Sequence, residues 1–143
     1  TLLDGLLSNI NVVDNIAKVE NFFFNEVQRT KNTIKKINNG KKWLVLIDEL
    51  FKGTNVQDAM KCSLTVIKGL MKIKNSLFIL STHLYEIGEE LQEYPNLSFR
   101  YFETNVNNEQ VEFSYQLKEG ISEDRIGYVI LKREKVVEML EKL

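Results

Sequence analysis

The sequence predicts an α/β fold with a mainly parallel sheet, flanking helices and a carboxyl-terminal β-hairpin followed by a helix. Two apolar runs, at residues 43–47 and 77–80, flank a stretch of helical periodicity at 56–74. The order strand, helix, strand is typical of a parallel crossover unit, which is nearly always right-handed. Two β-like segments around a short polar turn follow later in the chain and predict the hairpin.

Composition predicts one globular domain. Of the 143 residues, 43% are apolar and 27% are charged, which suits a core that buries roughly two-thirds of the unfolded surface. The net charge of −1 gives no overall basic field for wrapping nucleic acid. The single cysteine, Cys62, predicts a packing role and a reducing compartment. No apolar run approaches the ~20 residues that cross a bilayer, so we expect a cytoplasmic setting and no membrane partner.

The amino-terminal part predicts a strand, a helix and a second strand. Residues 1–14 have the alternating and clustered apolar positions of a strand and a loop. Residues 22–38 repeat apolar positions at the spacing of one helix face. These positions are Phe23, Val27, Thr30, Ile34 and Ile37. A helix stop at residues 38–40 precedes the run 43–47, whose unbroken apolar character predicts a strand covered on both faces.

The rest of the chain continues the same alternation of elements. The predicted elements are a helix at 56–74, a strand at 77–80, a short helix at 84–92, hairpin strands at 97–106 and 110–117, and a final helix at 126–143. The short helix ends before Tyr94, Pro95 and Asn96, and the hairpin turns at residues 107–109.

Two adjacent carboxylates, Asp48 and Glu49, directly follow the strand at 43–47. Ligands of parallel α/β sheets collect at the carboxyl ends of the strands. An acid there holds a hydrated Mg²⁺ on the phosphates of a nucleotide, and the next acid orients or deprotonates the attacking water. The alternative is a pair of solvated acids, because an apolar run that ends in Asp-Glu is a common pattern.

His83 is the only histidine, and it follows Ser81 and Thr82 at the end of the strand at 77–80. Neighbouring parallel strands lie ~4.8 Å apart, so residues at both strand ends reach one phosphate group. An isolated histidine more often makes a local structural hydrogen bond. Its pairing with Asp48 and Glu49 instead favours contact with a terminal phosphate or a positioned water.

A family resemblance rests on these motifs. The segment after the first apolar run reads DELFKGTN, and the second ends in STH before a helix. Together they resemble the ATPase domain of the MutS family of DNA mismatch-recognition proteins, a branch of the ABC-type ATPases. The segments LLDGLLSNINVVDNI and FSYQLKEGISEDRIGYVILK extend the likeness over most of the chain, and Phe23 and Glu26 match the family's S-x-F-x-x-E pattern. The resemblance implies that residues 1–143 form the carboxyl-terminal portion of a P-loop NTPase domain.

The resemblance also implies roles for the strand-end residues. Asp48 matches the Walker-B acid that binds Mg²⁺, and Glu49 matches the acid that activates water. His83 matches the histidine that senses the terminal phosphate of ATP. ATP and Mg²⁺ are the implied cofactors, and Glu49 and His83 are the implied catalytic residues.

Other matched residues lie outside the strand ends. Gly53, Thr54 and Asn55 match the loop that faces the partner subunit and its nucleotide. Their alternative role is a strand-to-helix turn with Thr54 or Asn55 as the helix cap. Glu26 matches the acid of the signature helix, although on an exposed helix face it would be a solvated charge. Asn21 stands where the family has the signature serine, and its amide still donates a hydrogen bond to nucleotide.

The sequence departs from the family in two ways. Val19 replaces the glycine that precedes the signature serine, which weakens close approach across the dimer. No G-x-x-x-x-G-K-[S/T] occurs in the sequence, so the phosphate-binding cradle is missing. We therefore expect the chain alone to be inactive and to be a fragment of a longer protein.

Two functions follow from the sequence. In the first, the full-length protein binds and hydrolyses ATP at an interface with a second copy, and couples hydrolysis to DNA bound by domains absent from this chain. In the second, the chain is a nucleotide-independent dimerisation or interaction module that retains the fold without the chemistry. Upstream sequence with a phosphate loop would favour the first function.

Overall fold

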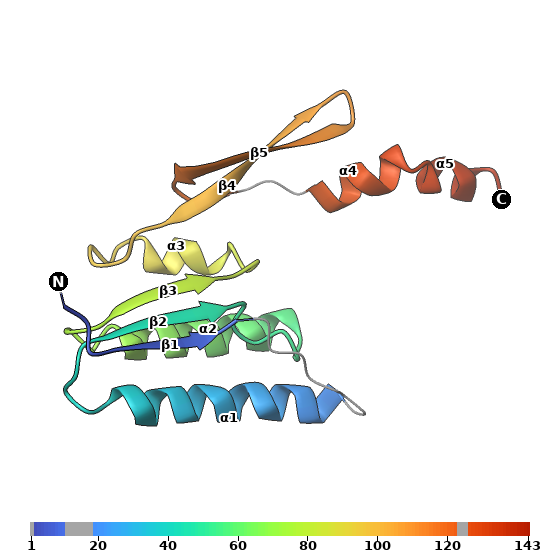
Figure 1. The fold of residues 1–143 in the computed structure, drawn as a ribbon. Helices are drawn as coiled ribbons and strands as arrows, with labels where there is room; N and C mark the ends of the chain where they lie inside the picture. The colour runs from blue at the N-terminus through green and yellow to red at the C-terminus, as the bar shows by residue number, and fades with distance from the viewer. Residues whose placement is uncertain (1, 11–18, 123–125) are drawn as a thin grey trace. The chain divides into compact units, whose positions relative to one another are not determined.

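The computed structural model describes residues 2–10, 19–122 and 126–143 (Figure 1). The elements are β1 (Gly5–Asn9), α1 (Val19–Ile37), β2 (Trp43–Asp48), α2 (Val56–Leu70), β3 (Leu77–Ser81), α3 (Ile87–Leu91), β4 (Arg100–Asn107), β5 (Gln110–Glu119), α4 (Ile126–Arg133) and α5 (Val136–Glu141). They divide into two compact units, Thr1–Ile87 and Gly88–Leu143. The α/β fold with a small parallel sheet and an antiparallel hairpin confirms the coarse prediction, while the assignment to the P-loop NTPases stays a prediction.

The first unit contains a parallel sheet in the order β1-β2-β3. Leu7 pairs with Val45, and Val45 pairs with Phe78, so the three strands run side by side in register. The helices α1 and α2 connect successive strands, which confirms the predicted strand, helix, strand order. Because all three strands are parallel, their carboxyl ends meet at one edge of the sheet.

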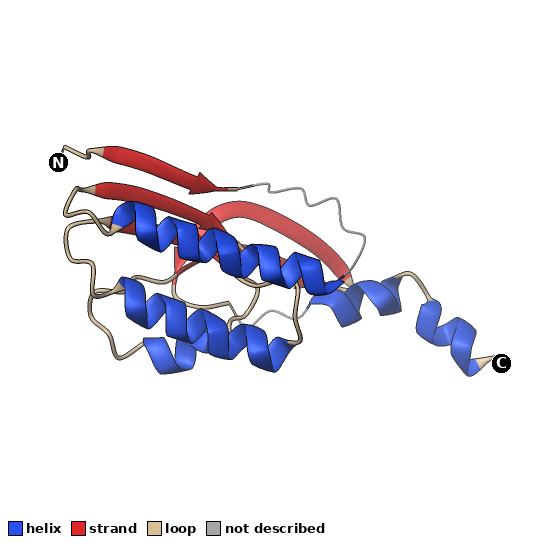
Figure 2. Ribbon diagram, turned by 90° about the horizontal axis from the view of Figure 1, so that it is seen from below, coloured by secondary structure: helices blue, strands red, loops and turns tan. Residues whose placement is uncertain are grey.

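The core of this unit lies between the sheet and the helices α1 and α2, which cover the same sheet face (Figures 1 and 2). Ile37 of α1, Val45 of β2 and Leu70 of α2 form one buried cluster. A second cluster, nearer the strand ends, contains Leu50 and Phe51. The second cluster therefore supports the segment that follows β2 directly.

The opposite face of the sheet is also apolar. Leu6 on β1 and Leu77 and Ile79 on β3 lie on this face and are 57–62% exposed. Within the described part of the first unit, no helix covers it (Figure 1). In β2 itself, the strand that was predicted to be covered on both faces, every residue is buried or half-buried, so exposure on this face is confined to the flanking strands β1 and β3.

The buried face of α1 also differs from the predicted one. Ile37 is buried as expected, but Val27 and Ile34 are 39% and 40% exposed. Glu26 and Thr33 are buried in their place, at 7% and 5%. Apolar spacing alone missed both residues, because each is polar and each is satisfied by a hydrogen bond.

The second unit contains the predicted hairpin of β4 and β5. Asn107 pairs with Gln110, so the turn is two residues long rather than three. Its residues, Asn108 and Glu109, have φ values of 50° and 66°. Positive φ at both central residues is typical of the hairpin turn that matches the twist of the flanking strands.

Three predicted helices have different bounds in the structure. The helix predicted at 56–74 ends at Leu70. The helix predicted at 84–92 covers only Ile87–Leu91. The final helix is divided into α4 and α5, because Lys135 adopts a left-handed conformation with φ 63° between them. No helix among residues 2–10, 19–122 and 126–143 has both the length and the apolar character to span a membrane.

Candidate functional site

The carboxyl ends of β2 and β3 bring polar side chains together. Asp48 and Ser81 are paired in register, and the Ser81 hydroxyl donates to Asp48 Oδ1 at 2.5 Å. The backbone N–H of Glu49 lies 3.0 Å from the carbonyl oxygen of Ser81 and 3.1 Å from its hydroxyl. Both acids are therefore fixed relative to β3, as expected for parallel strand ends.

Glu49 and His83 contact each other directly. His83 Nε2 lies 2.8 Å from Glu49 Oε1, a hydrogen bond in which a protonated Nε2 donates to the carboxylate. Lys52 Nζ lies 3.6 Å from the other oxygen of Glu49. The side chains of Glu49 and His83 are 30% and 86% exposed, so the pair remains open to a ligand. The sequence predicted the proximity of Glu49 and His83 but gave no signal for Lys52.

The backbone after β2 is strained. Glu49 and Phe51 have φ values of 52° and 57°, in the left-handed region that costs an L-residue about 1–2 kcal/mol. Phe51 is held there by burial and by its contact with the ring of Phe23, whose centroid lies 5.8 Å away. Strained residues of this kind cluster at functional sites, because the surrounding structure must hold them in place.

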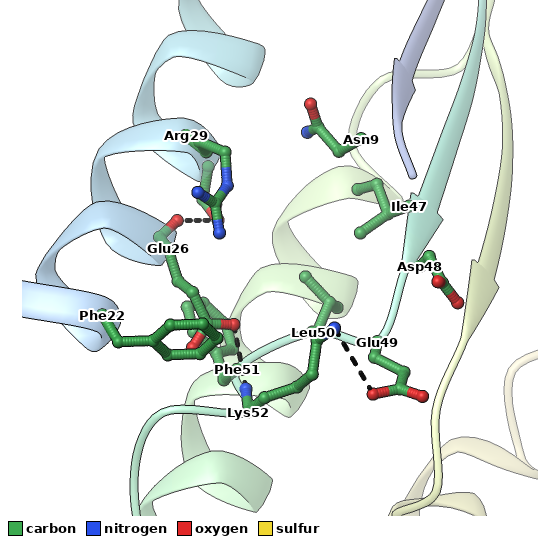
Figure 3. A pocket seen from close by; sticks show the side chains of 11 residues that line it. Asn9, Phe22, Glu26, Arg29, Ile47, Asp48, Glu49, Leu50, Phe51 and Lys52 are labelled. Carbon is green, nitrogen blue, oxygen red and sulfur yellow. Dashed lines mark hydrogen bonds and ion pairs between the residues drawn. The ribbon is translucent and has the colours of Figure 1, made fainter. Parts of the chain in front are cut away.

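Glu26 lies beneath this strained segment. Its Oε2 accepts from the backbone N–H of Lys52 at 2.9 Å, and its Oε1 accepts from Gly53 N–H at 2.7 Å. The dashed lines in Figure 3 join Lys52 both to Glu26 and to Glu49. Glu26 is buried, so the alternative that it is a solvated charge was wrong; sequence alone could not show that backbone N–H groups would satisfy it.

The loop residues predicted to face a partner subunit also form a local turn. A Cβ on Gly53 would overlap the Phe22 ring and would lie 3.0 Å from the backbone nitrogen of Phe23. Asn55 is the N-cap of α2, with its Oδ1 accepting from Asp58 N–H at 2.9 Å. The capping alternative is therefore confirmed for Asn55. The partner-facing role of Gly53, Thr54 and Asn55 stays a prediction.

Replacing Asn55 with Ala should lower the free energy of unfolding by about 1 kcal/mol, because one N–H at the start of α2 loses its acceptor. Urea denaturation followed by the fluorescence of Trp43, the only tryptophan, measures this change in the first unit. Asn55→Ser keeps an accepting oxygen at the cap without placing a second carboxylate beside Asp58, whose Oδ2 accepts from the Asn55 amide at 3.0 Å, and should lose clearly less stability than Asn55→Ala. An equal loss for both variants would contradict the capping role.

Asn21 lies near the start of α1. Its side chain falls outside what the structure describes, so its predicted contact with nucleotide stays a prediction. The same holds for the loop predicted to follow β1, which falls on residues 11–18.

A small pocket lies between α1 and the ends of β1 and β2 (Figure 3). Its polar lining residues are Asn9, Glu26, Arg29, Thr30, Asp48, Glu49 and Lys52. Its cavity volume of about 40 Å³ holds no more than a water or two. This pocket is therefore too small to enclose a nucleotide.

The strand ends supply a carboxylate of the kind that holds a hydrated Mg²⁺. Among the residues that the structure describes, no group of three His, Cys, Asp or Glu side chains is arranged to hold a metal ion. Mg²⁺ commonly binds through one or two carboxylates, several waters and the phosphates of a substrate. Asp48, with Ser81 beside it, supplies one such carboxylate.

Comparison with known proteins identifies the family. The family model described as MutS domain V matches residues 1–140. Similar proteins include the DNA mismatch repair protein msh3 of Aspergillus oryzae, 24% identical over 131 residues, and the DNA mismatch repair protein MutS of Aquifex pyrophilus, 26% identical over 131 residues. The first match covers 88% of the chain and 12% of the relative, and the second covers 92% and 15%.

The DNA mismatch repair protein MSH4 of Arabidopsis thaliana is 22% identical over 119 residues, which are 83% of the chain and 15% of that protein. The chain thus spans only a small part of the length of these relatives. The predicted resemblance to the MutS family is confirmed, because the family model covers almost every residue. The chain belongs to the MutS domain V family.

Proposed function

We propose that the chain is the carboxyl-terminal part of an ABC-type ATPase domain in a MutS-like DNA-repair protein. In this proposal, the full-length protein binds ATP and Mg²⁺ at an interface between two copies and couples hydrolysis to DNA binding elsewhere in the protein. The observation that carries the proposal is the contact of Glu49 with His83 at 2.8 Å, directly beside the Asp48 and Ser81 pair. The names of the relatives, all DNA mismatch repair proteins, support the link to DNA.

Each strand-end residue has a distinct part in this proposal. Asp48 would hold the hydrated Mg²⁺, with its carboxylate oriented by the Ser81 hydroxyl. The ion would supply positive charge that stabilises the phosphate oxygens. Glu49 orients the attacking water and accepts its proton. His83 exchanges its bond with Glu49 for a bond to a terminal phosphate oxygen.

Other parts of the protein complete the site in this proposal. The sequence contains no phosphate loop, and the relatives are several times longer than the chain. We therefore assign the phosphate cradle to another segment of the full-length protein. Asn21 and the loop residues Gly53, Thr54 and Asn55 are assigned to contacts with the second copy and its nucleotide. The cellular setting proposed for this activity is the cytoplasm.

Replacing Asp48 with Asn tests the proposed function in the full-length protein. We expect the Mg²⁺ concentration that gives half-maximal ATP hydrolysis to rise roughly 10- to 100-fold, because an amide replaces the charged group that orders the metal's water shell. Steady-state ATPase assays over a Mg²⁺ titration measure this shift. Asp4→Asn is a matched control, because Asp4 accepts from Lys42 N–H at the opposite end of the sheet.

An unchanged Mg²⁺ requirement in Asp48→Asn would contradict the role of Asp48. The absence of any Mg²⁺-dependent hydrolysis from the wild-type protein would favour the interaction module instead. That second function draws support from Asn21, which stands where the family has the signature serine.

A further inference from the structure

We infer that Glu26 is a positioning residue that sets the geometry of the water-activating carboxylate through the backbone of Lys52 and Gly53. This inference rests on the proposed function, because it names a residue that controls the same site. Glu26 lies on α1, and its carboxylate bonds to the turn that directly follows Glu49 and not to Glu49 itself.

The first argument is the burial and bonding of the Glu26 carboxylate. Only 7% of the residue is exposed, and each carboxylate oxygen accepts from one of two consecutive backbone N–H groups. Charge-assisted hydrogen bonds of this kind are about twice as strong as neutral ones. An apolar side chain would fill the same space without the desolvation cost of a charge. The carboxylate therefore serves to hold these two N–H groups in one place.

The second argument is the position of Lys52 between two carboxylates. Its backbone N–H donates to Glu26, and its Nζ lies 3.6 Å from Glu49 Oε2. Glu49 in turn contacts His83 at 2.8 Å. Contacts thus run without interruption from α1, through the turn after β2, to the end of β3. The Lys52 backbone also continues directly through residues 50 and 51 to Glu49, so a shift of the turn would displace the Glu49 carboxylate together with the ammonium group beside it.

The third argument is the close packing of the turn on α1. A Cβ on Gly53 would overlap the Phe22 ring and would lie 2.9 Å from Glu26 Oε1. The turn therefore cannot shift toward α1, and the Glu26 bonds prevent it from shifting away. Because Asn21 lies one residue before Phe22 on the same helix, contact of a second copy with the start of α1 would be transmitted to Glu49 by this route.

Glu26→Gln tests the inference, because the amide keeps one accepting oxygen but turns an N–H₂ group toward the other backbone donor. In the full-length protein, we expect kcat for ATP hydrolysis to fall about ten-fold while KM for ATP changes less than about two-fold. Amide hydrogen exchange, read by mass spectrometry, should quicken about ten-fold in the peptide containing Lys52 and Gly53. Peptides from β2 should keep their wild-type exchange rates.

Thr33→Val is the matched control. Thr33 is buried on the same helix and accepts from Asn9 Nδ2 at 2.9 Å, but it does not bond to the turn. The control should leave kcat and the exchange of the turn unchanged. An equal fall of kcat in Thr33→Val would show that any loss of a buried hydrogen bond on α1 lowers kcat. That result would overturn the specific role of Glu26.

Glu26→Asp provides a second variant if Glu26→Gln fails to fold. It keeps the charge but shortens the side chain by one methylene, so its carboxylate cannot reach both backbone N–H groups, and the same fall of kcat at nearly constant KM is expected. Wild-type kcat in a folded Glu26→Gln or Glu26→Asp protein would overturn the inference while leaving the proposed ATPase function intact. A wild-type protein without ATPase activity would overturn both.

Discussion

Replacing Glu49 with Gln is expected to lower kcat for ATP hydrolysis in the full-length protein by roughly 10²–10⁴-fold, the usual contribution of a general base. The amide has nearly the same shape as the carboxylate but cannot accept a proton from the attacking water. ATP binding should persist with a dissociation constant within about three-fold of the wild type, because Gln still occupies the same space. Single-turnover hydrolysis and equilibrium nucleotide binding measure the two effects separately.

Glu89→Gln is the matched control for this experiment, because Glu89 is an exposed acid on α3. It should hydrolyse ATP at the wild-type rate. Undiminished turnover in Glu49→Gln would remove Glu49 from the proposed mechanism. Loss of nucleotide binding together with turnover would indicate that Glu49 supports the fold of the site and not the chemical step.

Replacing Ile37 with Ala is expected to lower the free energy of unfolding of the first unit by about 2–5 kcal/mol. Ile37 is 1% exposed and packs with Val45 and Leu70 in the cluster between α1, β2 and α2. The truncation removes buried apolar surface and leaves a cavity that the surrounding side chains fill only in part. Urea denaturation followed by Trp43 fluorescence reports on this cluster, because Trp43 packs against it.

Ile34→Ala makes the same chemical change on the same helix at a residue that is 40% exposed. We expect a loss below about 1 kcal/mol, because surface truncations of this kind have small effects. The difference between the two losses of unfolding free energy tests which face of α1 is buried. Equal losses for the two variants would favour the helix face predicted from apolar spacing over the one in the structure.

Features set by short-range patterns were predictable from the sequence. The parallel order of β1, β2 and β3 followed from apolar runs separated by helical periodicity. That order alone was sufficient to bring Asp48, Glu49 and His83 to one edge of the sheet. The cap at Asn55 and the hairpin were likewise encoded by a few local residues, because turn and cap chemistry depends on side chains close in sequence.

Features set by long-range backbone contacts were not predictable. The burial of Glu26 depends on N–H groups of Lys52 and Gly53, which are distant in sequence. A prediction from apolar spacing never places a carboxylate on the buried face of a helix. The face predicted for α1 therefore included Val27 and Ile34 in place of Glu26. The break at Lys135 was missed for a related reason, since its left-handed conformation carries no Gly or Asn signal.

The left-handed conformations of Glu49 and Phe51 link this protein's thermal stability to its proposed activity. Glycine at either position would relieve about 1–2 kcal/mol of backbone strain. At position 49 the relief would remove the proposed general base, and at position 51 it would remove a buried aromatic ring that supports the turn. Loss of the buried Phe51 ring would cost about 3–5 kcal/mol, more than the strain relieved there, so only position 49 sets stability against the proposed chemistry. Selection for heat resistance alone would favour glycine at position 49, so stabilising substitutions should be sought outside this turn.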